Sequence, residues 1–113
     1  MLKELQTASI VVPSLWFLEV SNGLIMGERS HRLRRTETDE ALTLIHRLTL
    51  HVDDRSSLSL VSDVLALARQ YMLTTYDAAY LELALRLSLP LATLDRRLGT
   101  AAKKAGIRLY RAK

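Results

Sequence analysis

The stretch Leu73–Leu98, LTTYDAAYLELALRLSLPLATLDRRL, contains the pattern that decides the fold. Its first half predicts a helix from near Asp77 to near Ser88, and a proline then separates that helix from the next apolar run. This run, Leu91–Leu94, predicts a short buried strand, and Asp95 stands at the start of the next helix. A helix, a buried strand and a second helix in immediate succession are typical of an α/β fold.

The same alternation continues on both sides of this stretch. The β-branched run Ser9–Val12 predicts a strand, and a helix from Pro13 to about Arg29 comes after it. The other predicted elements are the end of a helix over residues 2–8, a helix capped by Thr36 or Thr38 that runs to about residue 48, a strand at 50–52, a helix from about Ser57 to Met72, a helix at 96–105 that stops at Gly106, and a last strand at 107–110. Short apolar strands between helices predict a mainly parallel sheet that helices cover on both faces.

The size and composition of the chain limit the possible classes of protein. A length of 113 residues predicts a single domain, 1–113. The absence of cysteine excludes disulfides, thiolate catalysis and zinc sites built on cysteine. No apolar run reaches the roughly 18–20 residues that span a bilayer. The N-terminus also lacks the layout of a signal peptide, so we expect a cytoplasmic protein with no membrane partner.

Basic side chains are concentrated in two parts of the chain. The net charge is +4, which favours a polyanionic partner. The segment after Asp95 contains no acid and carries Arg96, Arg97, Lys103, Lys104, Arg108, Arg111 and Lys113. A second cluster comes after the first long helix and consists of Arg29, Arg32, Arg34 and Arg35. A surface that only keeps the protein soluble is an equally good interpretation of either cluster by itself.

Three acids stand at or near the ends of predicted elements. Glu19 shares a helix face with Asn22, three residues later, and Asp77 stands near a helix N-terminus. Asp95 comes directly after the strand LATL, and binding sites in open α/β sheets lie beyond the carboxyl ends of strands. Carboxylates that converge repel one another unless a divalent cation lies between them, and Mg²⁺ and Mn²⁺ prefer oxygen ligands. The three acids therefore predict a site for Mg²⁺ or Mn²⁺.

Such a site would suit the hydrolysis of a nucleic-acid backbone. A metal ion held by carboxylates activates water for attack on phosphorus. Arg96 and Arg97, directly after Asp95, would contact the phosphate. Each acid also has an ordinary structural interpretation, because Glu19 can extend to solvent and Asp77 and Asp95 can be helix N-caps. Thr93 can be a plain strand residue.

Three segments of the chain resemble PIN domains, and specifically the VapC-type toxin ribonucleases. They are VVPSLWFLEVSNGL at 11–24, LTTYDAAYLELALRLSLPLATLDRRL at 73–98 and AAKKAGIRLY at 101–110. The resemblance covers the chain in order from about Ile10 to Tyr110, and YDAAYLELA and PLATLD are its most specific parts. It implies a three-layer α/β sandwich that cleaves RNA phosphodiesters.

The resemblance also implies roles for particular residues and a protein partner. Acids that match Glu19, Asp77 and Asp95 help to bind Mg²⁺ or Mn²⁺ in that family. Asn22 and Thr93 match polar residues that support these acids. The implied partners are RNA and a VapB-like antitoxin that wraps the toxin and blocks its site.

The chain departs from the family pattern at its N-terminus. PIN domains open with a strand that carries a further metal-binding Asp and forms the middle of the sheet, and this chain lacks that strand and most of the helix after it. Three outcomes are open: a fragment of a longer active nuclease, a degenerate form whose sheet closes differently, or two copies that complete each other. We expect a homodimer, with exchanged or edge-paired elements.

Two other classes of function compete with the ribonuclease. A degenerate PIN domain without the first Asp would be inactive, and would serve as an interaction module that binds an antitoxin. A basic nucleic-acid binder would use only the segment after Asp95, and its binding would depend on salt and ignore metal.

Overall fold

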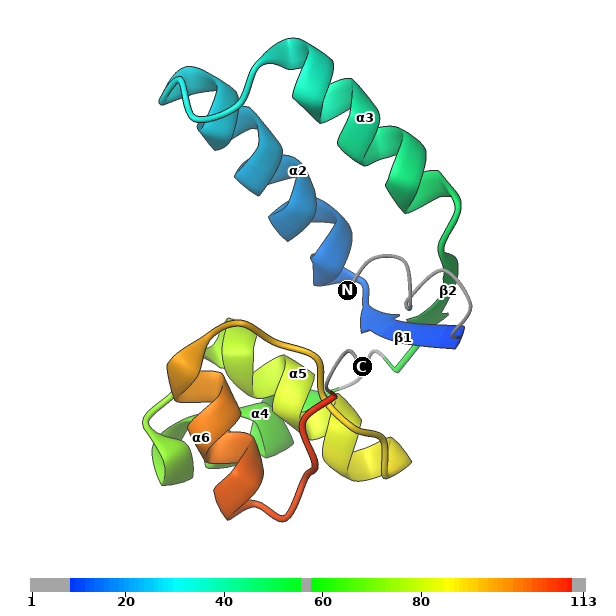
Figure 1. Cartoon of the computed structure of the whole chain (residues 1–113). Helices are drawn as coiled ribbons and strands as arrows, with labels where there is room; N and C mark the ends of the chain where they lie inside the picture. The colour runs from blue at the N-terminus through cyan, green and yellow to red at the C-terminus, as the bar shows by residue number, and fades with distance from the viewer. Residues whose placement is uncertain (1–8, 56–57, 111–113) are drawn as a thin grey trace. The chain divides into compact units, whose positions relative to one another are not determined.

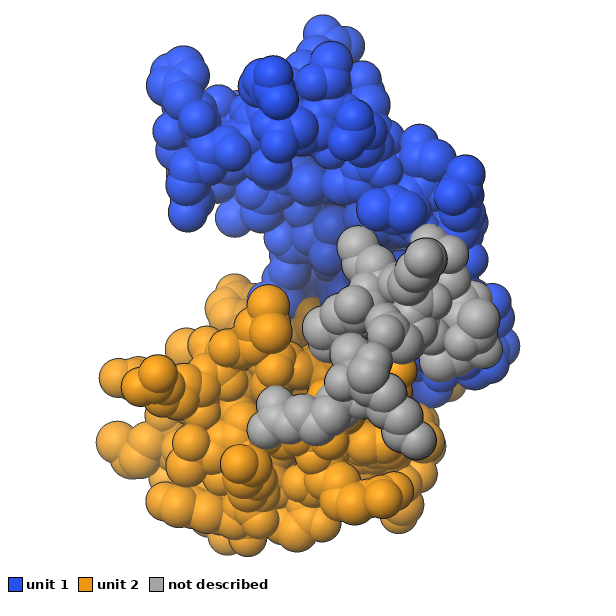
Figure 2. All heavy atoms as spheres, viewed as in Figure 1, with its two compact units in different colours: residues 1–52 blue, residues 53–113 orange. Residues whose placement is uncertain are grey.

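The structure is a computed structural model that describes residues 9–55 and 58–110. The chain divides into two compact units, Met1–Val52 and Asp53–Lys113, which Figure 2 colours separately. The elements in chain order are β1 (Ser9–Pro13), α2 (Leu15–Arg29), α3 (Arg35–His46), β2 (Thr49–Asp53), α4 (Leu58–Tyr71), α5 (Thr75–Leu87) and α6 (Arg96–Lys104) (Figure 1). The helix predicted over residues 2–8 lies outside the described residues.

The first unit contains a two-stranded sheet, β1 and β2, and the antiparallel helices α2 and α3 (Figure 1). The turn between the two helices depends on Gly27, which is buried. A Cβ atom at this position would lie 2.7 Å from Cδ1 of Leu33, so a larger residue would require the Leu33 side chain to shift. The carbonyl oxygen of Gly27 accepts hydrogen bonds from the N–H groups of Arg32 and Leu33, at 2.9 and 3.0 Å. The strands predicted at 9–12 and 50–52 and the helix predicted from Pro13 to about Arg29 are confirmed.

The start of α3 differs from the prediction. Neither Thr36 nor Thr38 is the N-cap, because the helix begins at Arg35 and Arg34 occupies the cap position. The cause is Glu37, whose carboxylate accepts a hydrogen bond from the backbone N–H of Arg34 at 3.0 Å and so satisfies a donor that a cap would otherwise leave free. Thr38 instead turns inward and is buried.

The second unit holds the larger hydrophobic core. Helix α5 packs against both α4 and α6 (Figure 1). The buried residues of this core are Leu81, Ala84, Leu91, Leu98, Ala101 and Ala102. Helix α6 ends at Lys104, and Gly106 has a φ of +84° shortly after it, as the sequence predicts for a glycine after a helix C-terminus. The core therefore fixes the position of the segment that carries Asp95, because it buries residues on both sides of it.

Helix α4 uses a different face for packing than the one that its spacing suggests. Leu58, Val61 and Leu65 recur at helical spacing, but all three side chains are exposed. The contacts with the core come from Leu67 and Tyr71 on another face of the helix. Because α4 is apolar on more than one face, its periodicity does not identify which face is buried.

The predicted strands at 91–94 and 107–110 are wrong as extended strands. The two segments meet in a single parallel bridge between Leu91 and Leu109. Its hydrogen bonds run from the Leu91 N–H to the Arg108 carbonyl, at 2.9 Å, and from the Tyr110 N–H to the Leu91 carbonyl, at 2.8 Å. A two-stranded pairing is marginal unless a third strand or a helix supports it, and no named strand of the described residues pairs with either segment. The predicted α/β class is confirmed in its general form, with helices and a small sheet.

Candidate functional site

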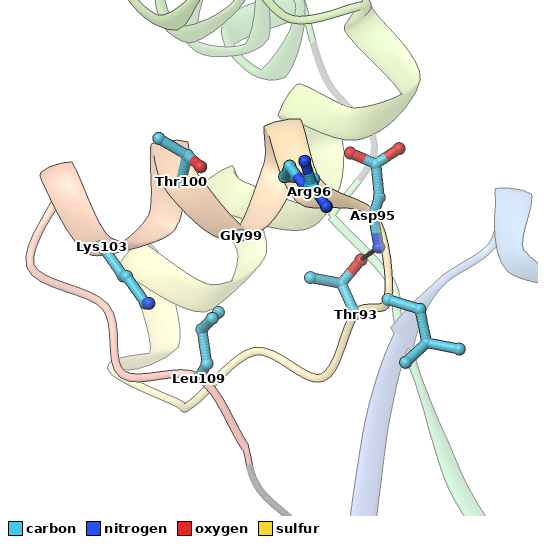
Figure 3. A pocket seen from close by; sticks show the side chains of 8 residues that line it. Thr93, Asp95, Arg96, Gly99, Thr100, Lys103 and Leu109 are labelled. Atoms are coloured by element: carbon cyan, nitrogen blue, oxygen red, sulfur yellow. Dashed lines mark hydrogen bonds between the residues drawn. The ribbon is translucent and has the colours of Figure 1, made fainter.

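Asp95 stands where the chain turns into α6. The hydroxyl oxygen of Thr93 accepts a hydrogen bond from the Asp95 N–H at 3.0 Å, which closes the turn (Figure 3). The Asp95 carboxylate accepts a hydrogen bond from the Leu98 N–H at 2.8 Å and is the N-cap of α6. The capping role that the sequence left open for Asp95 is therefore confirmed, and Thr93 is a turn residue rather than a strand residue.

The capping role leaves Asp95 able to bind a cation. The hydrogen bond from Leu98 uses the oxygen Oδ1, whereas an ionised carboxylate offers about four lone-pair positions on its two oxygens. Asp95 is also exposed. The hydrogen bond orients the side chain while a second face of the carboxylate remains available to a ligand.

Asp77 lies in the first turn of α5 in the same unit. The N-cap of this helix is Thr74, whose hydroxyl accepts a hydrogen bond from the Asp77 N–H at 3.2 Å. The interpretation of Asp77 as an N-cap is therefore wrong, because α5 begins at Thr75, two residues earlier than predicted. A carboxylate in a first turn is still favoured by the positive end of the helix dipole.

Glu19 and Asn22 belong to the other unit. Both lie on α2 three residues apart, so they share a helix face as predicted, and both are exposed. The structure thus brings Asp77 and Asp95 into one unit and leaves Glu19 in the other. In the described ranges, 9–55 and 58–110, no three His, Asp or Glu side chains form a group that could hold a metal ion.

A polar pocket lies beside Asp95 in the second unit. Its volume is about 250 Å³, and it is lined by Thr93, Leu94, Asp95, Arg96, Gly99, Thr100, Lys103 and Leu109 (Figure 3). Arg96, Thr100 and Lys103 come from α6, and Figure 3 shows Lys103 extending toward the segment that carries Leu109. Of the two arginines predicted to contact phosphate, Arg96 lines this pocket and Arg97 does not.

Sequence reasoning missed Thr100 and Lys103 as site residues. A usable signal was present, because residues 96, 100 and 103 have the i, i+4, i+7 spacing of one helix face. The neighbouring basic residues obscured this spacing, because Arg97 and Lys104 carry the same charges one position after Arg96 and Lys103. The spacing, rather than the charge count, distinguishes the residues that line the pocket.

A charged cluster that links α4, α5 and the segment that precedes α4 was also missed. Glu82 is buried and accepts hydrogen bonds from Arg86 at 3.0 and 3.1 Å and from Arg55 at 3.3 Å. The second partner of each arginine is another carboxylate, Asp53 for Arg86 at 2.6 Å and Asp63 for Arg55 at 2.7 Å. The hydrogen bonds that Arg86 donates to Asp53 and Glu82 raise the pKa of Arg86 further above its usual value. These closed pairs tie the chain after β2 to α4 and α5.

The first unit contains an apolar groove between α2 and α3. Its volume is about 370 Å³, and it is lined by Trp16, Phe17, Val20, Ser21, Leu24, Leu42, Ile45, His46, Leu48 and Leu50. Trp16 and Phe17 form an edge-to-face pair with ring centroids 5.3 Å apart. Grooves of this chemistry suit the apolar face of a helix or strand.

Neither the protein-family models nor the curated proteins compared with this sequence include a match to it. Among the described residues, no helix combines the length and the apolar character that a membrane crossing requires.

Proposed function

We propose that this chain is a PIN-like, VapC-type toxin that hydrolyses RNA with Mg²⁺ or Mn²⁺, and that Glu19, Asp77 and Asp95 are its metal ligands. The observation that carries the proposal is the position of Asp95. Its exposed carboxylate is oriented by α6 and lies at the edge of a pocket lined by the cations Arg96 and Lys103. An acid for a metal ion beside cations for phosphate is a combination that suits metal-assisted hydrolysis of a phosphodiester.

The ligand chemistry of Asp95 suits the proposed cation. Mg²⁺ and Mn²⁺ take carboxylate and water oxygens, and Asp95 keeps free lone pairs after capping α6. When bound, such a cation would lower the pKa of a coordinated water and stabilise charge on the phosphate oxygens.

The remaining chemistry belongs to side chains of this protein. Thr93 would hold Asp95 in place through the turn, because its hydroxyl oxygen accepts a hydrogen bond from the Asp95 N–H. The guanidinium of Arg96 would bind the phosphate that Asp95 faces, and Asn22 would orient the carboxylate of Glu19.

The proposal includes a PIN-like three-layer sandwich with a further strand in its sheet. The bridge at Leu91 and Leu109 and the pair β1 and β2 are two short pieces of sheet. Each has an edge at which another strand can pair. A second copy would supply it by exchanging or edge-pairing an element, which is consistent with the expected homodimer.

RNA cleavage by the purified chain tests this proposal. We expect a mixed RNA to be cut with Mn²⁺, and a chelator to abolish the cut. Asp95→Asn and Glu19→Gln should each lower the rate at least about 100-fold, because each removes a charge from the metal site while keeping the shape of the side chain. Asp54→Asn is the matched control, since Asp54 is exposed and lies outside the proposed site.

Two results would contradict the ribonuclease. The first is wild-type protein that leaves RNA intact at high concentration with Mn²⁺. The second is cleavage that survives the chelator and both site variants, because it would point to a contaminating nuclease.

The apolar groove of the first unit favours a second candidate, a non-catalytic module that binds a VapB-like antitoxin. Leu42 and Ile45 line the groove, and Leu42 is 40% exposed, which is unusual for a leucine on the inner side of a helix pair. A VapB-like peptide should then bind the chain whether or not a chelator is present. Leu42→Glu should weaken that binding, whereas Thr43→Glu, on the adjacent exposed residue outside the groove, should not.

A further inference from the structure

The polar pocket beside Asp95 presents one face of α6 to the solvent. Arg96, Thr100 and Lys103 line it at i, i+4 and i+7, so their side chains lie in one row along the helix. Together they offer a guanidinium, a hydroxyl and an ammonium group, all of which can donate hydrogen bonds. Phosphate oxygens are pure acceptors and match such a row.

The charges of the row are not neutralised within the described part of the chain. Neither Arg96 nor Lys103 has an ion-pair partner there, whereas Arg55 and Arg86 each have two. Asp95 is the one acid among the lining residues, so two cations and one anion leave a charge of +1. The Leu98 N–H already draws on part of the negative charge of Asp95.

The volume and the lining of the pocket suit a phosphate group better than a base. Its volume of about 250 Å³ far exceeds the roughly 10–15 Å³ that a single water needs by the same measure. It is below the roughly 300–1,000 Å³ of pockets that enclose a drug-sized molecule. Few aromatic or aliphatic side chains line it, with Leu94 and Leu109 the exceptions, so it offers no stacking platform for a base.

We propose that this pocket binds a second backbone phosphodiester of RNA through Thr100 and Lys103, next to the phosphodiester that Asp95 faces and Arg96 contacts. This inference rests on the proposed function, because it assigns a second phosphate of the same RNA substrate. It assigns Lys103 and Thr100 to substrate binding and removes Arg97 from it. Thr100 and Lys103 would hold the RNA in register with Asp95 without taking part in the chemical step.

Binding measured without metal tests the pocket separately from cleavage. The probe is a short, fluorescently labelled 2′-O-methyl RNA, whose anisotropy is measured in the presence of a chelator. Lys103→Gln should weaken binding about tenfold, the size expected for one lost hydrogen bond to a charged group. It should also lower the salt slope of log K by about 0.7, the value for one phosphate contact on a single strand.

Adjacent residues provide matched controls for every change of charge. Lys104→Gln and Arg97→Gln alter the net charge as Lys103→Gln and Arg96→Gln do, but neither residue lines the pocket. Lys103, Lys104, Arg96 and Arg97 are all exposed, so these substitutions should leave the fold intact. Thr100→Val changes no charge and should still weaken binding about threefold to tenfold, because it removes one donor.

Three outcomes would overturn the pocket. The first is an equal loss of binding for Lys103→Gln and Lys104→Gln, which would mean a diffuse basic surface. The second is unchanged binding in both Thr100→Val and Lys103→Gln. The third is a wild-type chain that does not bind the probe. Free inorganic phosphate should compete only weakly, and strong competition would point to a free phosphate ligand in place of RNA. Loss of cleavage in the Mn²⁺ assay leaves these results unaffected, so failure of the ribonuclease and failure of the pocket are distinguishable.

Discussion

At the scale of single residues, Glu82 is the one buried acid among the described residues. Its side chain is 6% exposed, and both of its oxygens accept hydrogen bonds from arginine. A carboxylate taken out of water is expensive, and here the cost is offset by Arg55 and Arg86. Because each arginine also binds a second carboxylate, the cluster is a chain of pairs rather than one isolated pair.

We expect Glu82→Gln to destabilise the protein by about 2 kcal/mol. This is below the roughly 3–5 kcal/mol for breaking a buried pair, because Arg55 and Arg86 keep Asp63 and Asp53 as partners. Urea unfolding measures the change in the free energy of unfolding. Asp63→Asn is the control, and its cost should stay below about 1 kcal/mol because that side chain is 54% exposed. An equal loss in the free energy of unfolding for the two variants would show that the burial of Glu82 does not strengthen its ion pairs.

At the scale of elements, α6 depends on the cap that Asp95 provides. Asp95→Ala removes the acceptor of the Leu98 N–H and should cost about 1 kcal/mol of stability. Asp95→Asn should cost much less, because asparagine is an equally good N-cap. Urea unfolding of both variants checks this difference. If Asp95→Asn unfolds as readily as Asp95→Ala, any loss of activity in that variant reflects the fold and not the metal site.

The start of α3 should respond to acid. The hydrogen bond from the Arg34 backbone N–H, and then that from the Arg34 side chain, lower the pKa of Glu37 below its usual value. A lowered pKa means that the contribution of Glu37 to stability is complete above the unfolded value, roughly 4.3, and is lost as the pH falls through the lower folded value. We therefore expect the first turn of α3 to fray at acid pH. NMR of the amides of residues 34–38 measures this, and Glu37→Gln should remove the pH dependence.

The elements that the sequence predicted well are those with strong local signals. Helix α2 is predictable from Pro13 and its apolar spacing, and the end of α6 from Gly106. The segment Leu91–Leu94 has an equally apolar composition, yet Leu94 is 95% exposed and only Leu91 pairs. A strand needs a partner from elsewhere in the chain, so its local sequence does not determine whether it forms. Lys103 was missed for a different reason, because the neighbouring basic residues obscured its spacing with Arg96 and Thr100 on one face of α6.

At the scale of the whole molecule, the exposed apolar side chains are the feature that the packing of single elements does not explain. Many large apolar side chains of the described residues are exposed, and α4 has no fully buried residue. Leu58, Val61 and Leu65 form a stripe along α4, with exposed fractions of 86%, 54% and 37%. Contiguous apolar surface of this kind marks a site of association in soluble proteins.

We expect the chain to associate with itself through the α4 stripe, which agrees with the homodimer that the sequence predicts. Light scattering coupled to size exclusion should give a mass above that of one chain, and the mass should fall on dilution. The double variant Leu58→Glu and Leu65→Glu should shift the protein to the monomer, because it places two charges in the apolar contact. Ala66→Glu with Gln70→Glu adds the same charges to exposed positions on another side of α4 and should leave the association unchanged.

A monomer at every concentration, or the same mass for both double variants, would mean that the stripe is not the contact. If the first double variant is monomeric and also loses RNA cleavage while it still binds the 2′-O-methyl probe, a second copy is needed to complete the catalytic site and not the phosphate pocket.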